Sequence, residues 1–95
     1  MDIQELKNAC NQKYGQAIEG MEQGKPNADI ARLLLDAASD LLAIAKTDFL
    51  TRAACENKAA KLLAAAKKLR AEGDASAVYR DLTGRALRTT PVPPQ

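Results

Sequence analysis

The stretch from Ala28 to Glu72 contains neither glycine nor proline, and this limits the fold more than any other feature of the chain. Alanine, leucine and lysine dominate it, and all three are good helix formers. The whole chain of 95 residues holds one phenylalanine, two tyrosines and no tryptophan. A β-fold of this size would need more aromatic and β-branched residues. The sequence therefore predicts one small all-α domain.

The segment Lys46–Thr51 breaks the apolar spacing, and this break decides whether the stretch is one helix or two. Continuing the spacing would place Asp48 and Thr51 on the core face, which is unfavourable for polar side chains. Aspartate and threonine also commonly cap helices. We therefore predict a short turn near Thr47–Leu50, with Phe49 or Leu50 tucked over the end of the bundle. The alternative is an unbroken rod of about 65 Å, which needs a partner chain to cover its leucines.

Glycine, proline and capping residues set the other helix boundaries. Gly24 suits the end of a helix and Pro26 cannot continue it, while Asp2 and Asn27 are candidate N-caps. The predicted helices span Asp2–Glu22, Ala28–Lys46, Arg52–Glu72 and Ser76–Thr83. Short connections make consecutive helices antiparallel neighbours. We predict an antiparallel three-helix bundle with a short fourth C-terminal helix over residues 1–84, followed by an extended Pro-rich tail over 85–95.

Apolar residues at helical spacing define the expected core. The second predicted helix carries two apolar bands, which form a face wider than the stripe of about 100° needed for one neighbour. It is therefore expected to lie between two partners. The core positions of the first and third helices are Ile3, Leu6, Cys10, Tyr14, Ala17, Ile18 and Met21, and Cys55, Ala59, Leu62, Ala66 and Leu69.

The sequence offers little for catalysis. It has no histidine, no Cys-x-x-Cys and no phosphate-binding glycine motif. Cys10 and Cys55 lie on core positions and are expected to be reduced, structural thiols. We predict no enzyme activity, no cofactor and no metal.

Charge and hydropathy bound the partners and the location. The net charge of +2 disfavours nucleic acid, although Arg80, Arg85 and Arg88 leave weak binding open. No signal peptide and no membrane span is visible in the sequence, so we expect a cytoplasmic location.

Between Gly24 and Leu69 the chain resembles a microtubule-interacting-and-trafficking (MIT) domain. The similar residues are Glu22–Ala31, which match the family's first turn and the start of its second helix, then Ala37 and Leu41, and then Arg52–Cys55 at the start of the third helix. The similarity covers most of residues 3–72. The resemblance implies an antiparallel three-helix bundle of the kind often found at the N-terminus of AAA ATPases.

The same resemblance implies a function. MIT domains bind short motifs from the tails of ESCRT-III-like proteins in grooves beside the third helix. Carried over by position, the partner-binding residues are Leu35, Ala38, Leu42, Ala53, Ala60, Leu63, Ala64 and Lys67. We thus expect a non-catalytic protein–protein interaction module that recruits a peptide to an attached AAA ATPase, with Lys67 meeting an acidic residue.

Three alternatives stay open. The exposed alanines need no partner, since alanine is the best helix former. In the second alternative the chain is a free-standing small helical inhibitor or scaffold protein. In the third it is a self-associating helical dimer. The sequence leaves the oligomeric state undecided.

Overall fold

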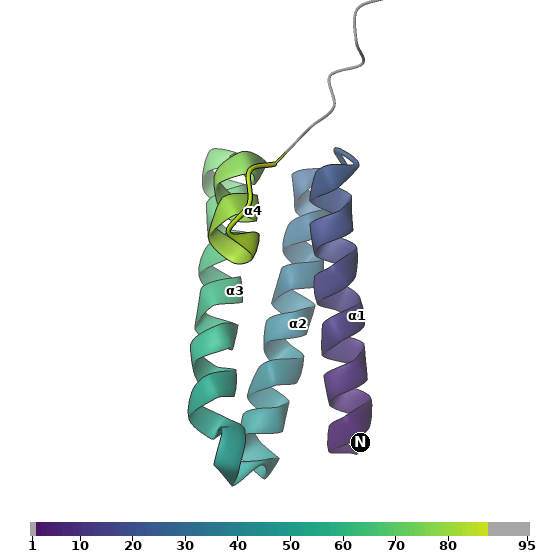
Figure 1. The fold of residues 1–95 in the computed structure, drawn as a ribbon, viewed down its shortest axis with the longest axis vertical. Coiled ribbons are helices and arrows are strands. Elements are labelled where there is room, and N and C mark those ends of the chain that lie inside the picture. The colour runs from purple at the N-terminus through teal and green to yellow at the C-terminus, as the bar shows by residue number, and fades with distance from the viewer. Residues whose placement is uncertain (1, 88–95) are drawn as a thin grey trace, which may run out of the picture.

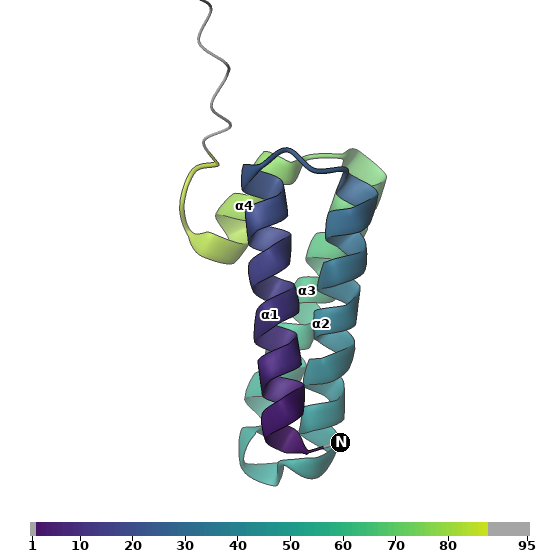
Figure 2. The ribbon, with the colours of Figure 1, turned by 90° about the vertical axis from the view of Figure 1, so that its right-hand side faces the viewer.

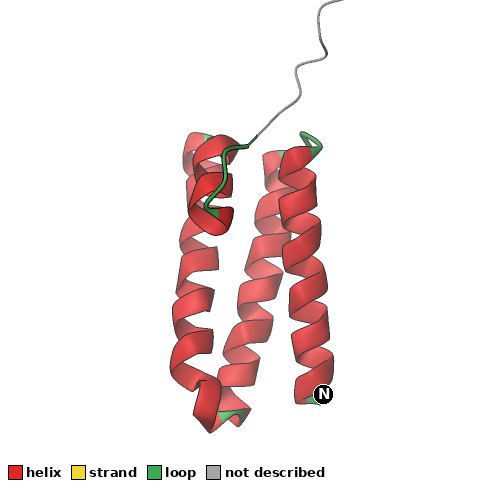
Figure 3. Cartoon of the chain, in the orientation of Figure 1, coloured by secondary structure: helices red, strands yellow, loops and turns green. Residues whose placement is uncertain are grey.

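The structure is a computed structural model that describes residues 2–87 of the chain. Four α-helices follow one another: α1 (Ile3–Glu22), α2 (Asn27–Thr47), α3 (Arg52–Glu72) and α4 (Ala75–Thr83). A 3-10 turn, η1 (Phe49–Thr51), joins α2 to α3, and residues 2–87 contain no strand (Figure 3). The prediction of an all-helical bundle is confirmed. Most of the predicted tail, including Arg88, lies outside the described residues.

The central helix of the bundle is α2, which packs along both α1 and α3 (Figure 1). The chain rises along α1, returns along α2 and rises again along α3. The helices α1 and α3 hardly touch each other, and α4 lies across them at the end where α3 finishes (Figure 2). Two neighbours account for the wide apolar face of the second helix.

Small side chains allow the helices to approach one another closely in the core. Ala37 and Ala66 are fully buried at 0 % exposure, on α2 and α3 respectively. Larger side chains from all four helices surround them and share the same cluster: Met21, Ile30, Leu34, Leu62, Leu69 and Val78. Among residues 2–87 no polar or charged side chain is buried. Packing of apolar surface therefore holds this part of the chain together.

The first turn begins α2 one residue earlier than predicted. Gly24 has a φ of +72°, which glycine adopts without strain, and Pro26 precedes the first helical residue. Asn27 is thus inside the helix and not its N-cap. Its side chain instead donates a hydrogen bond to the carbonyl oxygen of Gly73 at 3.2 Å, so the start of α2 is joined to the end of α3.

The second turn separates α2 from α3, so the stretch from Ala28 to Glu72 is two packed helices and not a rod. The backbone amide of Asp48 still donates to the carbonyl of Ile44 at 2.8 Å, but Asp48 itself is extended. The prediction that Phe49 or Leu50 covers the bundle end is wrong, because they are 78 % and 92 % exposed. Ile44 and Ala45, in the last turn of α2, are buried without them.

Candidate functional site

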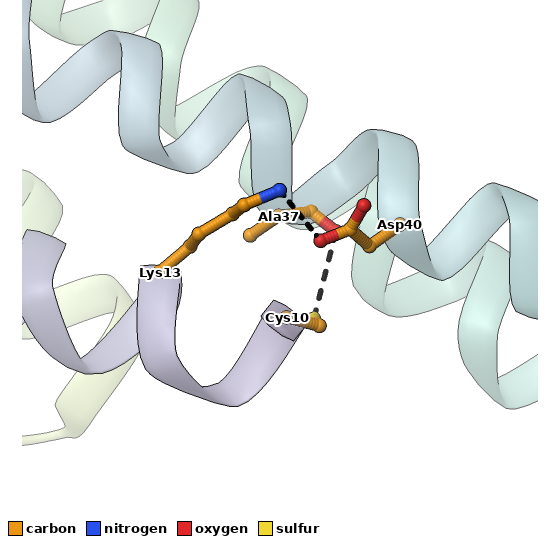
Figure 4. Close-up of polar contacts among 4 residues, drawn as sticks. All are labelled: Cys10, Lys13, Ala37 and Asp40. Atoms are coloured by element: carbon orange, nitrogen blue, oxygen red, sulfur yellow. Dashed lines mark hydrogen bonds and ion pairs between the residues drawn. The ribbon is translucent and has the colours of Figure 1, made fainter. Parts of the chain in front are cut away.

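The surroundings of the two cysteine thiols indicate that both have a structural role. Cys10 is 2 % exposed, and its Sγ donates to the carbonyl oxygen of Ala37 at 3.5 Å (Figure 4). Burial raises the pKa of the Cys10 thiol, which makes it a poor nucleophile. Cys55 is half-buried, with its Sγ 3.7 Å from the hydroxyl oxygen of Thr51, so it lies at the edge of the core and not inside it. Both thiols are free.

A charged pair beside Cys10 joins α1 to α2. The Nζ of Lys13 donates to Oδ2 of Asp40 at 2.9 Å (Figure 4). This hydrogen bond raises the pKa of Lys13. Because both side chains are partly exposed to water, such a pair contributes only about 0–1 kcal/mol to stability. Within residues 2–87, no cluster of three or more potential ligands for a metal ion occurs.

A largely apolar hollow lies between α2 and α3. We call it the Leu35–Leu63 hollow, an open depression of about 340 Å³ lined by Leu35, Leu63, Ala66, Lys67, Arg70 and Ala71. Leu63 is 41 % exposed and Leu35 is half-buried. The lysine and arginine stand at its rim, since both are exposed residues of α3. Three of the predicted partner-binding residues, Leu35, Leu63 and Lys67, therefore meet at one place.

The other predicted partner-binding residues are not in this hollow. Leu42, 39 % exposed, lies nearer η1 in a second depression. Ala53, Ala60 and Ala64 are exposed on α3 and line neither depression. Ala38 is 0 % exposed, so its prediction as a contact residue is wrong. Ala38 belongs to the buried core cluster, because α2 packs against both α1 and α3.

Sequence reasoning missed Arg70 and Ala71, although a signal was present. Arg70 follows Leu63 by seven positions and Lys67 by three, and residues at this spacing share one face of a helix. The residues of the hollow thus continue one line along α3. The prediction instead favoured the alanines on a neighbouring face of α3, which are Ala53, Ala60 and Ala64.

Positive charge is concentrated on α3. This helix carries six basic and two acidic residues, whereas α1 and α2 each carry three acidic and two basic residues. Lys68 is near a carboxylate, at 3.8 Å from Asp81 of α4. Lys67 and Arg70 thus give the Leu35–Leu63 hollow a cationic rim, which favours an acidic ligand.

A further depression between α1 and α3 is more polar. Lys58 lies over the ring of Tyr14, 5.3 Å from its centroid, and the Tyr14 hydroxyl donates to the carbonyl of Leu82 at 3.2 Å. Burial raises the pKa of Tyr14. The depression, of about 370 Å³, is thus partly filled by its own side chains and bordered by α4. Its lining is more polar than that of the Leu35–Leu63 hollow.

Comparison of the chain with protein-family models, curated proteins and solved structures found no match in any of the three. In residues 2–87, no helix combines the length and the apolar character needed to cross a membrane.

Proposed function

We propose that the chain is an MIT-like interaction module, an antiparallel three-helix bundle without catalytic activity, that binds a short acidic amphipathic segment of a partner protein. The binding surface is the Leu35–Leu63 hollow between α2 and α3. The single observation that carries the proposal is Leu63, a large apolar side chain 41 % exposed beside half-buried Leu35 in an open hollow. Recruitment of that segment to an attached AAA ATPase belongs to the same proposal and rests on the resemblance alone.

The shape of the hollow suits a helix or an extended segment. Ala71 is small and exposed, so a partner's backbone can approach α3 closely at this end of the hollow. Two apolar side chains of the partner, one helical turn apart, would cover Leu35 and Leu63. Full burial of such side chains contributes about 1.5–3 kcal/mol each, which sets an upper limit here because both leucines are already partly covered.

The basic residues at the rim determine which charge the ligand carries and how it is oriented. Lys67 and Arg70 are both exposed, and the ion pairs found within residues 2–87, Lys13–Asp40 and Lys68–Asp81, include neither of them. Aspartate or glutamate residues on the polar side of the segment would pair with them. Exposed ion pairs contribute little affinity, but they accelerate association and exclude basic segments.

The test uses a synthetic amphipathic peptide of about 14 residues, with leucines at helical spacing and glutamates between them. Its control is the same peptide with lysine in place of every glutamate. Binding is measured by NMR titration of the isotope-labelled chain. The glutamate peptide is expected to bind and to shift the amide signals around Leu35 and Leu63, and the lysine peptide is expected to bind at least tenfold more weakly.

The variant Leu63→Asp tests whether the Leu35–Leu63 hollow is the surface that binds the peptide. It is expected to abolish peptide binding while circular dichroism shows unchanged helicity, since Leu63 is not part of the buried core. Leu50→Asp, at a more exposed leucine on the opposite end of the bundle, is the matched control and should bind as the original chain does. Unchanged affinity of Leu63→Asp would show that the hollow is not the binding surface.

A further inference from the structure

We propose that the end of the bundle at η1 is a self-association surface, through which two copies of the chain pair by a twofold axis. Phe49 and Leu50 form the projecting part of this surface. The inference is independent of the proposed peptide site, because the Leu35–Leu63 hollow lies further along α3.

The two projecting side chains are not part of the buried core. Phe49 and Leu50 are the most exposed large apolar residues among those described, at 78 % and 92 %. Phe49 is also the single phenylalanine of the chain. A one-residue extension at Asp48 and a 3-10 turn can be formed by polar residues as well. Adjacent exposed apolar side chains that the core does not need indicate a contact surface.

A receptive surface lies directly beside them. An open depression of about 550 Å³, which we call the Leu42 hollow, is lined by Ser39, Leu42, Ala43, Ala45, Lys46, Arg52 and Glu56. Arg52 connects the hollow to the projection: its guanidinium carbon is 5.5 Å from the centre of the Phe49 ring, and its Nε donates to the carbonyl of Ala45 at 3.1 Å. The ring is therefore held next to the hollow.

One end of the molecule thus carries both halves of a contact. In a twofold pair each copy presents the same surface, so each must supply both a projection and a place to receive one. Phe49 and Leu50 of one copy would lie over Leu42 of the other, which is 39 % exposed. The small alanines of the hollow leave room for a bulky side chain.

The charges around this end also match a second copy. Lys46 and Arg52 are basic and Asp48 and Glu56 are acidic, so two such ends brought together by a twofold axis can pair opposite charges. An anionic lipid surface would instead favour an excess of basic residues, which this end lacks. Stable complexes bury roughly 1,200–2,000 Å², and two projecting side chains with one shallow hollow supply few anchors, so we expect a weak dimer whose formation depends on concentration.

Sedimentation equilibrium of the full chain tests this association. The mass-average mass is expected to rise from 10.2 kDa toward twice that value as the concentration increases from about 10 µM to about 1 mM. The variants Leu50→Glu and Phe49→Ser should each stay monomeric over the same range. Both positions are exposed, so helicity measured by circular dichroism should be unchanged. Leu63→Asp, at the peptide site, is the matched control and should dimerise as the original chain does.

Three results would overturn the proposal. The first is a mass that stays at 10.2 kDa up to about 1 mM. The second is association that persists unchanged in both Leu50→Glu and Phe49→Ser. The third is binding to phosphatidylserine vesicles through Phe49 and Leu50 by a chain that does not self-associate. Because Leu50→Glu should retain peptide binding and Leu63→Asp should retain dimerisation, failure of either proposal is visible without the other.

Discussion

The side-chain amide of Asn27 donates to the carbonyl oxygen of Gly73 at 3.2 Å and joins the first residue of α2 to the residue that ends α3. The two residues are 46 positions apart in the chain. The bond can form only if α3 returns alongside α2. Gly73 has a φ of +68°, the left-handed conformation that ends a helix and turns its carbonyl groups toward new partners.

Asn27→Ala is expected to lower the free energy of unfolding by about 0.5–1.5 kcal/mol, because it removes this hydrogen bond. Urea denaturation followed by circular dichroism measures the change. The control is Asn8→Ala, which removes only a contact within α1, between the Asn8 side-chain oxygen and the amide of Gln4. Equal losses in both variants would mean that the bond between Asn27 and Gly73 contributes nothing particular to the hairpin.

Two alanines of α3 provide a test of the close helix packing. Ala66 is 0 % exposed at the contact of the helices, whereas Ala64, two positions earlier, is exposed. Ala66→Leu is expected to cost about 1–3 kcal/mol of stability because the extra methyl groups have no space. Ala64→Leu should change stability by less than about 0.5 kcal/mol. Thermal or urea unfolding compares them, and similar effects at the two positions would contradict the assignment of the core face.

The buried thiol predicts a loss of stability at alkaline pH. Burial raises the pKa of Cys10 above its ordinary value of 9.0. Between these two pKa values the folded chain keeps a proton that the unfolded chain has released, so the free energy of unfolding falls as pH rises. This contribution is complete below pH 9.0 and is lost as pH passes the raised pKa.

Unfolding of the original chain and of Cys10→Ala should therefore be compared as a function of pH. Tyr14 and Lys13, whose pKa values are also raised, titrate in both proteins, so the difference between the two curves reports Cys10. The stability advantage of the original chain should shrink above pH 9.0. An advantage that stays constant with pH would show that the Cys10 thiol is not desolvated.

The cationic rim of the Leu35–Leu63 hollow predicts how peptide binding depends on salt. Replacing both Lys67 and Arg70 with glutamate should weaken binding of the glutamate peptide about tenfold or more and reverse the preference toward the lysine peptide. Raising the salt concentration should weaken binding to the original chain, because exposed charges are screened. Fluorescence anisotropy of labelled peptides measures both effects. Identical salt dependence in the double variant would exclude a role for these two residues.

Helix positions were predictable because local rules agree along most of this chain. Helical spacing, the glycines and the capping residues placed every helix end within one residue of the structure. The capping details differ: Asp2 precedes α1 but its side chain makes no capping hydrogen bond, and Asn27, a residue type that often caps helices, bonds to Gly73 instead. A cap depends on neighbouring residues, whereas this bond depends on a chain segment far away in the sequence.

The candidate site was predictable only in part, because exposure depends on how the helices meet. Ala38 and Ala64 look alike in the sequence, but the first is enclosed by neighbouring helices and the second faces water. Phe49 or Leu50 was expected to cover the end of the bundle, since large apolar side chains are usually buried. The turn geometry at Asp48, which the sequence does not encode in any periodic pattern, directs them outward.

Both proposed surfaces exist only if α2 and α3 fold back on each other, and one distance tests this directly. Spin labels are attached to cysteines placed at Ala28 and Ala71, both exposed, after Cys10→Ala and Cys55→Ser remove the native thiols. Pulsed electron resonance on the monomer then measures the separation. Helices packed at about 8–10 Å between axes predict a label distance below about 25 Å. A separation near 65 Å, the length of one continuous helix at about 1.5 Å per residue, would contradict the hairpin and both surfaces with it.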